Sequence, residues 1–544
     1  MARLSIALGI LASAYAFLLF RLYDVQLVKG SDYLAQAESR FVSPDFLKAA
    51  RGTIYLTDKD GNKLPASTNK HFPLIYAVPK VIEDPTEAAH RIGPIVGQSA
   101  EELEKKFLKN GDEYELILRK ADSKLARTVS DLGIKGIYVH TVPERFYPHG
   151  PLASHLLGFV APDESDEGEE GRYGVEEFFN DILSGNKGKV ENRKIVAPSA
   201  GSDVILTVDP NVQIEAARVL ANLVKKYKAN GGTVIIGDPK TGKILALTSV
   251  PDFDPNQYNK APLSSFINPV TQQIYEPGSV FKVITMAAGI DSGSITPETT
   301  YVDTGTLTMN GRTIQNHDFR THGPYGRVTM TNVIEHSLNT GAVFAERQMG
   351  RDIFKSYLEK FGLGEKTGVT LPGELKGDIR RLNPKERDII FATASYGQGV
   401  AVTPIGLITA VGAIANGGKL MSPYLDASLE PVLLREVIRE DTARKVTAMM
   451  VSAVDKADVA RIEGYSLAGK TGTAFVPDFV RGGYTENVIN TYVGFGPASD
   501  PRFIVLVRLN EPESAPFASL TVVPAFRELA QFMLNYYEIP PDRL

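Results

Sequence analysis

The feature that most constrains this chain is a short turn followed by an unbroken apolar segment. Residues 276–282 are Glu-Pro-Gly-Ser-Val-Phe-Lys, and residues 283–290 are apolar apart from Thr285. The Pro-Gly pair is typical of a loop that closes onto a helix, so the sequence predicts a helix that begins at Ser279. A helix that is apolar on all sides is buried. We therefore expect Lys282 in a domain interior, where desolvation lowers the pKa of an amine.

The spacing of the serine and the lysine suggests nucleophilic catalysis. Helix residues three apart lie on one face, so the Lys282 amine is within reach of the Ser279 hydroxyl, and a serine needs such a base to react at neutral pH. The same spacing occurs at Ser67–Lys70, in a polar stretch, and at Ser184–Lys187, in a Gly- and Asn-containing turn. For those copies an N-cap serine with a surface lysine is the simpler interpretation.

Length and composition exclude several classes of protein. A chain of 544 residues predicts more than one domain. The net charge of −5 gives no basic footprint for nucleic acid. Because the chain has no cysteine, thiol catalysis, disulfides and thiolate metal sites are excluded.

The N-terminus predicts a membrane anchor. Residues 4–20 carry no charge, are mostly apolar and are bounded by arginines, at the short end of the length that spans a bilayer. A cleaved signal peptide is the alternative, since Ala-Ser-Ala at 12–14 resembles a cleavage site. The apolar run continues past this point, which favours an uncleaved anchor over residues 1–23. With no second such run, everything from about residue 24 onward is expected on one side of the membrane.

Residues 24–201 are expected to form a separate first domain. Residues 51–64 predict a β-hairpin, with its turn at the Asp-Lys-Asp-Gly stretch. Short helices are predicted at 83–91 and 101–110. We find no catalytic set of residues here, so a spacer or docking module is the preferred interpretation.

Residues 202–544 are expected to form an α+β domain with one antiparallel sheet and helices packed on it. Asp209-Pro210 predicts the start of a helix, because proline suits a first turn. Hairpins are predicted near both ends of the domain, with helices between them. The predicted elements are helices at 210–228 and about 524–537, and strands at 204–208, 233–237, 243–248, 465–475, 491–496 and 503–509.

Two further motifs lie inside this second domain. Ser337-Leu338-Asn339 follows a predicted helical run at 331–336, and Lys470-Thr471-Gly472-Thr473 lies in a predicted strand. Lys-Thr-Gly also occurs at 240–242, in a hairpin turn, and at 366–368, in a loop. Of the three copies, the one at 470 lies in a predicted sheet strand and has a hydroxyl residue after its glycine.

The ordered set of three motifs resembles that of the serine penicillin-recognising enzymes. Further segments are similar to class B penicillin-binding proteins, so the resemblance covers nearly the whole chain. These segments are 252–256, 371–374, 396–399, Thr403-Pro404, Arg51-Gly52, Arg145 with Tyr147-Pro148, and Gly174-Val175-Glu176. The resemblance implies a penicillin-binding transpeptidase domain, with an antiparallel sheet flanked by helices, behind an N-terminal membrane helix and an elongated α+β pedestal.

The resemblance also implies a role for each motif residue in a serine acyl-enzyme mechanism. The residues and their implied roles are Ser279 as nucleophile, Lys282 as neutral amine base, Ser337 as proton relay, Lys470 as polarising cation, Asn339 as donor to the substrate amide, and Thr471, Gly472 and Thr473 as the substrate-binding strand. The backbone N–H groups of Ser279 and Thr473 are expected to form the oxyanion hole.

The implied donor is the D-Ala-D-Ala end of a peptidoglycan stem peptide, the acceptor is an amine on a neighbouring stem, and β-lactams acylate the serine. The chain is expected in the cytoplasmic membrane as a single-pass protein with its catalytic domain outside, working with a membrane glycosyltransferase. The form of residues 233–256 favours division over elongation. No metal or organic cofactor is implied, although His317-Asp318 and His336 permit a metal or triad interpretation. The alternatives are a D,D-carboxypeptidase or β-lactamase, and a non-catalytic scaffold or sensor.

Overall fold

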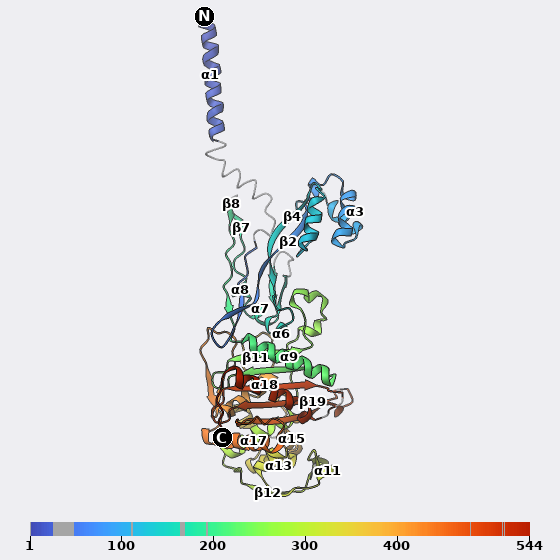
Figure 1. The fold of residues 1–544 in the computed structure, drawn as a ribbon, viewed down its shortest axis with the longest axis vertical. Helices are drawn as coiled ribbons and strands as arrows, with labels where there is room; N and C mark the ends of the chain where they lie inside the picture. Colours follow the sequence, from blue (N-terminus) through green and yellow to red (C-terminus); the bar gives the residue numbers. More distant parts are fainter. Residues whose placement is uncertain are drawn as a thin grey trace.

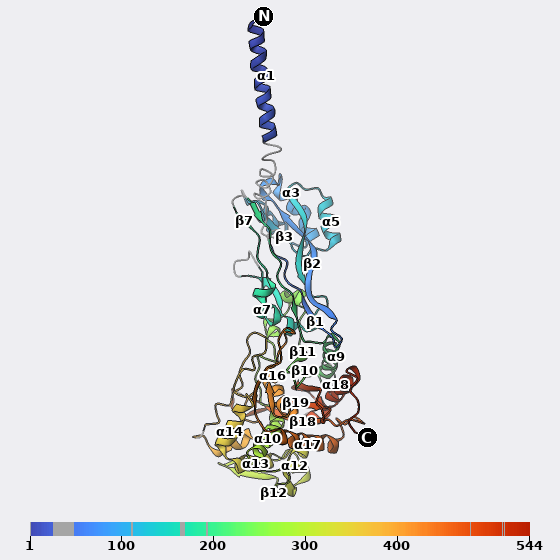
Figure 2. The ribbon, with the colours of Figure 1, turned by 90° about the vertical axis from the view of Figure 1, so that its left-hand side faces the viewer.

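The computed structural model describes residues 2–24, 48–109, 112–163, 169–191, 194–383, 385–478, 480–513, 515 and 517–543. The molecule is elongated, with α1 (Ala2–Tyr23) at one end and a broad C-terminal part at the other (Figures 1 and 2). Within the described residues, no helix meets the length and apolarity required of a membrane span. The first domain expected at 24–201 includes residues 25–47, which lie outside the described part of the chain.

The first domain is built on a long central strand. This strand, β2 (Lys63–Ala77), pairs antiparallel with β1 (Ile54–Thr57), β3 (Glu115–Leu118) and β4 (Ile137–Phe146). The hairpin predicted at 51–64 is therefore present as β1 and the start of β2. On the other side, β1 pairs in parallel with β9 (Val204–Ile205), just beyond the expected domain boundary.

A small helical lobe covers the far end of this sheet (Figure 2). It contains η3 (Pro79–Val81), α3 (Pro85–Val96), α4 (Ala100–Phe107) and α5 (Ser123–Asp131). Asp84 and Asp122 cap α3 and α5 by accepting backbone N–H bonds, and an apolar core that includes Leu103 and Phe107 packs against the sheet. The remaining elements of this part are α6 (Ser154–Leu157), β5 (Phe159–Pro162), β6 (Glu169–Arg172), α7 (Gly174–Phe178), α8 (Asn180–Leu183), β7 (Lys189–Glu191) and β8 (Lys194–Val196).

A buried ionic cluster ties together the base of the first domain. Glu176 is fully buried and accepts hydrogen bonds from Arg51 Nε and Arg145 Nε, each at 2.6 Å. Ser67 and Tyr147 also donate to Glu176 Oε1, at 3.1 and 3.2 Å. Burial alone would raise the pKa of Glu176, but the two arginines outweigh it and the pKa is lowered. The Ser-x-x-Lys copy at Ser67 thus belongs to the structural core.

The first domain also contacts the second through two family-like segments. The Tyr147 N–H donates to Asn256 Oδ1 at 3.0 Å, and Asn256 Nδ2 donates back to the Tyr147 carbonyl at 2.9 Å. Close by, Phe159, Phe253 and Phe266 form an aromatic cluster with ring centroids 4.8–5.9 Å apart. These contacts fix the first domain against the segment that follows β11 (Ile244–Val250) in the second domain.

The second domain contains a five-stranded sheet in the order β11-β10-β20-β19-β18, and every neighbouring pair is antiparallel. This confirms the α+β fold built on an antiparallel sheet, and the structure adds three separate two-stranded antiparallel sheets to the one that was expected. β18 lies at one edge of the sheet. The strands are β10 (Gly231–Gly237), β11 (Ile244–Val250), β18 (Ala468–Pro477), β19 (Tyr484–Gly496) and β20 (Phe503–Asn510).

Helices cover both faces of this sheet because alternate side chains of its strands point to opposite sides. α9 (Pro210–Tyr227) begins at the predicted Pro210 and is capped by the Asp209 side chain. α9 and α18 (Val522–Tyr536) pack on the face that presents Val234 and Val507. α16 (Pro404–Ala415) and α17 (Glu440–Ala457) contact strands of the sheet on the face that presents Ile235 and Leu506. α10 (Lys282–Asp291) packs between α13 (Asn339–Met349), α16 and α17, deep in the core.

The second domain has further elements, of which α11, α13, α15 and β12 lie in its lower lobe in Figure 1. They are η4 (Pro255–Lys260), η5 (Leu263–Phe266), η6 (Gly278–Phe281), β12 (Thr300–Asp303), β13 (Thr306–Met309), β14 (Arg312–Gln315), α11 (Phe319–His322), β15 (Gly326–Thr329), α12 (Met330–Glu335), α13 (Asn339–Met349), α14 (Arg351–Lys360), α15 (Asp388–Ala394), β16 (Lys419–Met421), β17 (Leu433–Glu436) and η7 (Ala518–Leu520).

Candidate active site

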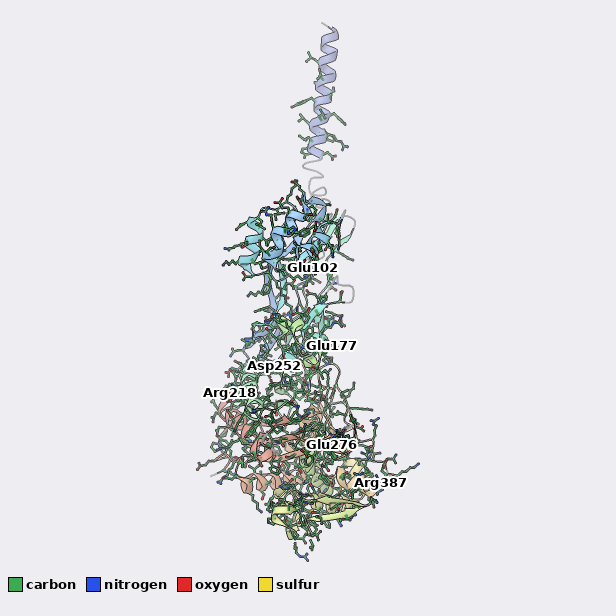
Figure 3. The ribbon with its side chains drawn as sticks, turned by 90° about the vertical axis from the view of Figure 1, so that its right-hand side faces the viewer. Glu102, Glu177, Arg218, Asp252, Glu276 and Arg387 are labelled. Carbon is green, nitrogen blue, oxygen red and sulfur yellow. The ribbon has the colours of Figure 1, made fainter. Side chains whose placement is uncertain are left out.

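Ser279 lies in a tight 3₁₀ turn, η6, which runs directly into α10. The α-helix predicted to begin at Ser279 begins three residues later, at Lys282, after this 3₁₀ turn. Gly278, the first residue of the turn, has a φ of +56° and donates its N–H to the Gly397 carbonyl at 3.2 Å. Just before the turn, Glu276 accepts hydrogen bonds from the Gly399 N–H and the Tyr484 hydroxyl, both at 2.9 Å. Figure 3 shows Glu276 in the broad C-terminal domain.

The open edge of β18 lies against this turn. A Cβ on Gly472 would lie 2.6 Å from the Pro277 carbonyl oxygen and 2.9 Å from Val280 Cγ2, closer than real contacts allow. A Cβ on Gly278 would lie 3.0 Å from the Thr473 carbonyl oxygen. Only glycine permits so close an approach of two backbones. The close approach of the two backbones explains why residue 472 is a glycine, which the sequence alone did not.

Lys282 and Lys470 converge on the Ser337 hydroxyl. The Lys282 amine, fully buried, donates to the Ser337 carbonyl at 2.5 Å and to Ser337 Oγ at 3.2 Å. The Lys470 amine, 4% exposed as a residue, donates to the same Oγ at 3.0 Å. Ser337 has a φ of +57°, a left-handed conformation that is uncommon outside glycine. With this backbone conformation, Ser337 presents its carbonyl oxygen to Lys282 and its side-chain Oγ to both lysines.

The site lowers the pKa of both amines. Burial lowers the pKa of Lys282 well below its ordinary value, the Lys470 charge lowers it further, and Asp318 opposes these effects. Burial lowers the pKa of Lys470 to about 7. The site therefore favours the neutral form of the Lys282 amine, and the Lys470 amine titrates near neutral pH. The lowered pKa of Lys282 agrees with the expectation drawn from the apolar segment that follows this residue.

Asn339 and Thr471 lie at the same site. Asn339 begins α13, and its Nδ2 donates to the Gln315 carbonyl at 2.8 Å. Thr471 Oγ1 accepts a hydrogen bond from the Lys470 amine at 3.2 Å. The structure thus gathers residues from three distant motifs around one hydroxyl, while their catalytic roles remain predictions.

The Thr473 hydroxyl, on the strand expected to bind substrate, already has two protein partners. Its Oγ1 donates to Asn490 Oδ1 at 3.2 Å and accepts the Ala518 N–H at 3.2 Å. The hydroxyl is therefore engaged with β19 and η7 in this structure. Asn490 precedes the predicted hairpin strand, and nothing in the sequence motif indicated this contact.

The positions of the histidines bear on whether they could bind a metal ion. His317 Nδ1 lies 3.9 Å from Asp318 Oδ1, and the Tyr325 ring lies between His322 and His336, with centroid distances of 3.9 and 4.5 Å. In the described part of the chain, no group of three or more His, Cys, Asp or Glu side chains is placed to hold a metal ion. Sequence reasoning named Asp318 only as part of this alternative.

Comparison with known proteins places this site in a family. Residues 232–531 match the model of the penicillin-binding protein transpeptidase domain, and residues 46–199 match that of the penicillin-binding protein dimerisation domain. Stage V sporulation protein D of Bacillus subtilis is 32% identical, over 96% of this chain and 84% of the relative. The chain belongs to the class B penicillin-binding proteins.

Two further comparisons cover at least 91% of this penicillin-binding protein. Peptidoglycan D,D-transpeptidase FtsI of Escherichia coli is 27% identical, over 100% of this chain and 93% of the relative. The crystal structure of a peptidoglycan synthetase from Bifidobacterium adolescentis matches with a TM-score of 0.69 at 25% identity, covering 91% of this chain and 97% of that one. The resemblance inferred from the motifs is thus confirmed for both domains.

Proposed function

We propose that this class B penicillin-binding protein is a peptidoglycan D,D-transpeptidase that cross-links stem peptides in cell-wall synthesis. The observation that carries the proposal is the placement of the Ser337 hydroxyl between the amines of Lys282 and Lys470, beside the turn that holds Ser279. Relatives named peptidoglycan D,D-transpeptidase support the same reaction. Peptidoglycan is the substrate, and penicillins bind as its mimics.

In the first half-reaction, Ser279 Oγ attacks the carbonyl carbon of the donor peptide. The neutral Lys282 amine takes the hydroxyl proton, since burial and the Lys470 charge lower its pKa and so favour the neutral form. The proton then passes through Ser337 Oγ, which contacts both amines, to the nitrogen of the leaving D-Ala. The product is an acyl-enzyme on Ser279.

Backbone groups and the edge strand hold the substrate. The N–H groups of Ser279 and Thr473 point at the developing oxyanion, and such donors act strongly in a site that excludes water. The donor peptide adds to the open edge of β18 as an extra strand. Asn339 donates to the donor amide, while Thr471 and Lys470 face the terminal carboxylate. In the second half-reaction an amine of a neighbouring stem attacks the acyl-enzyme and frees Ser279.

Acylation and product analysis together test this function. The full-length protein, incubated with penicillin, is expected to gain one adduct on the peptide that carries Ser279, and Ser279→Ala is expected to gain none. With a donor stem peptide and an acceptor amine, mass spectrometry should then detect the cross-linked product. Hydrolysed donor without any cross-link would contradict the transpeptidase and support a carboxypeptidase.

Acylation is expected to slow on the alkaline side as the pH rises through about 7. Burial lowers the pKa of Lys470 to about 7, so this amine loses its positive charge above that pH and no longer polarises Ser337 Oγ. The measurement is the rate of acylation by a fluorescent penicillin across the neutral range. Lys470→Arg, which cannot lose its charge, should abolish the alkaline decline. A decline that persists in this variant would exclude Lys470 as its source.

We further infer a single-pass anchor, an extracytoplasmic catalytic domain and a membrane glycosyltransferase partner. The uncharged run at 4–20 and the exposed large apolar side chains of α1, such as Leu11, Phe17 and Phe20, support the anchor. The form of residues 233–256 supports a role in division. Depletion of the protein from a rod-shaped host should then give filaments, and rounded cells would point to elongation instead.

A further inference from the structure

The turn that carries Ser279 is packed between two other segments of the second domain. On one side lies β18, where only a glycine at position 472 lets the two backbones approach. On the other side lies the loop that follows α15, where a Cβ on Gly397 would come within 2.3 Å of the Gly278 carbonyl oxygen. Gly278 also donates its N–H to the Gly397 carbonyl at 3.2 Å. The position of Ser279 therefore depends on where β18 and this loop are held.

Glu276, three residues before Ser279, bonds to both of these segments. Its Oε1 accepts the Gly399 N–H at 2.9 Å, within the loop after α15. Its Oε2 accepts the Tyr484 hydroxyl at 2.9 Å, and the same hydroxyl lies 3.2 Å from Oε1. Tyr484 is the first residue of β19, the strand that pairs with β18. One carboxylate therefore joins the turn, the loop and the β18–β19 hairpin.

The bond from Tyr484 holds the hairpin at an end where the strand pairing is irregular. Tyr484 lies opposite Pro477, at the end of β18 away from Lys470. The register shifts between Phe475 and Pro477, and such a shift disrupts the ladder of hydrogen bonds. Phe475 and Tyr484 are 46% and 45% exposed, so apolar burial holds this end only in part. The bond to Glu276 thus anchors the hairpin where its own ladder is interrupted.

A carboxylate suits this position because both of its partners are hydrogen-bond donors. Bonds to an ionised acceptor are stronger than those between neutral groups, and Glu276 is partly buried, which shields them from water. Burial raises the pKa of Glu276, whereas the bonds from Gly399 and Tyr484 and the charge of Arg381 oppose that rise. The two donors thus stabilise the form of Glu276 that binds both segments at once.

We propose that Glu276 is a positioning residue that holds the edge of β18 and the loop at 397–399 in place against the Ser279 turn. The proposal rests on the function proposed above, in which the donor peptide adds to the β18 edge, and it gives a role to a residue that none of the three motifs contains. Ser279 can attack only if the donor carbonyl on that edge lies within reach of its hydroxyl. A displacement of about 1 Å can slow a reaction about 10²-fold, so loosening of the edge is expected to impair acylation.

Three variants separate the bonds that Glu276 makes. Tyr484→Phe removes the bond to the hairpin and leaves the bond to Gly399. Glu276→Leu removes both bonds. Glu276→Gln keeps both, because its amide oxygen can accept the Gly399 N–H and its amide nitrogen can donate to the Tyr484 oxygen. Tyr138→Phe is the matched control, since Tyr138 lies on β4 of the first domain and is 42% exposed.

Acylation of the full-length protein by a fluorescent penicillin, at rising concentrations, gives a maximal rate constant and a half-saturating concentration. Tyr484→Phe should raise the half-saturating concentration about tenfold with little change in the maximal rate constant, because fewer molecules hold the edge in place while the reacting groups stay intact. Glu276→Leu should also lower the maximal rate constant, by about 10²-fold, because it frees the turn itself. Glu276→Gln should restore most of both quantities, and Tyr138→Phe should match the wild type.

Hydrogen exchange provides a readout that does not depend on the reaction. The amides of residues 484–489 should exchange faster in Tyr484→Phe and in Glu276→Leu than in the wild type, and at the wild-type rate in Tyr138→Phe. A Tyr484→Phe protein with wild-type kinetics and exchange would overturn the proposal, as would losses in Glu276→Gln as large as those in Glu276→Leu. Because Tyr484 is partly exposed, its variant keeps the test valid if Glu276→Leu fails to fold. Wild-type protein that is not acylated at Ser279 would instead reject the proposed function, and hydrogen exchange would still decide the role of Glu276.

Discussion

Lys282→Met is expected to slow acylation of Ser279 by at least about 10³-fold, nearly as much as removal of the nucleophile itself. A general base contributes factors of this order, and a nucleophile and its base act as a unit whose losses do not add. Methionine keeps the length and apolar stem of lysine but cannot accept the Ser279 proton or bond to Ser337. The measurement is the rate constant for acylation by penicillin, compared with Ser279→Ala and with the double variant.

Two controls accompany Lys282→Met: its folding stability, and a lysine-to-methionine variant at a distant position. Lys282 is fully buried, and an amine in an apolar interior carries a desolvation cost, so the variant is expected to be at least as stable as the wild type. Lys366→Met changes an exposed lysine in another Lys-Thr-Gly sequence and should leave acylation unchanged. A Lys282→Met protein that acylates at the wild-type rate would exclude this amine as the base.

Glu176→Leu is expected to lower the free energy of unfolding of the first domain by about 3–5 kcal/mol. The substitution leaves Arg51 and Arg145 buried without the carboxylate that pairs with both, and an uncompensated buried charge is much more costly than a missing pair. Hydrogen exchange of the amides in β1, β2 and β4 is the suitable measurement, because a two-domain chain need not unfold in one step.

The adjacent Glu177 offers a matched control for this experiment. It is exposed and accepts one hydrogen bond, from the Tyr173 N–H at 2.8 Å; Figure 3 labels it in the middle of the molecule. Glu177→Leu should cost no more than about 1 kcal/mol. Equal effects of the two variants would show that the buried cluster does not stabilise the domain.

The Glu176 cluster also predicts how this domain responds to acid. The net effect of burial and the two arginines lowers the pKa of Glu176, so its contribution to stability is present above the ordinary carboxylate pKa. That contribution is lost as the pH falls through the lowered value. The first domain of the wild type should therefore keep its stability in mild acid and lose stability only as the pH falls through the lowered pKa of Glu176. Glu176→Leu should not show this loss, because it has no carboxylate to protonate at this position.

Local sequence determined much of the fold of this protein. The Asp209-Pro210 pair set the start of α9, because the carboxylate caps the first turn and proline suits it. Apolar, β-rich runs on either side of short turns gave the hairpins β10–β11 and β19–β20. The unbroken apolar segment after Lys282 predicted its burial. These features depend on neighbours in the chain, which the sequence displays directly.

Tertiary structure decided the features that depend on distant parts of the chain. Ser337 is 55 residues from Lys282 and 133 from Lys470, and its left-handed backbone brings both amines to one hydroxyl. The spacing of apolar residues along the chain does not indicate which residues so far apart in sequence come together in the fold. The contact of Thr473 with Asn490 and the bond of Glu276 to Tyr484 are likewise set by packing. The motifs thus named the reacting groups, whereas the fold fixed their distances and pKa values, on which proton transfer depends.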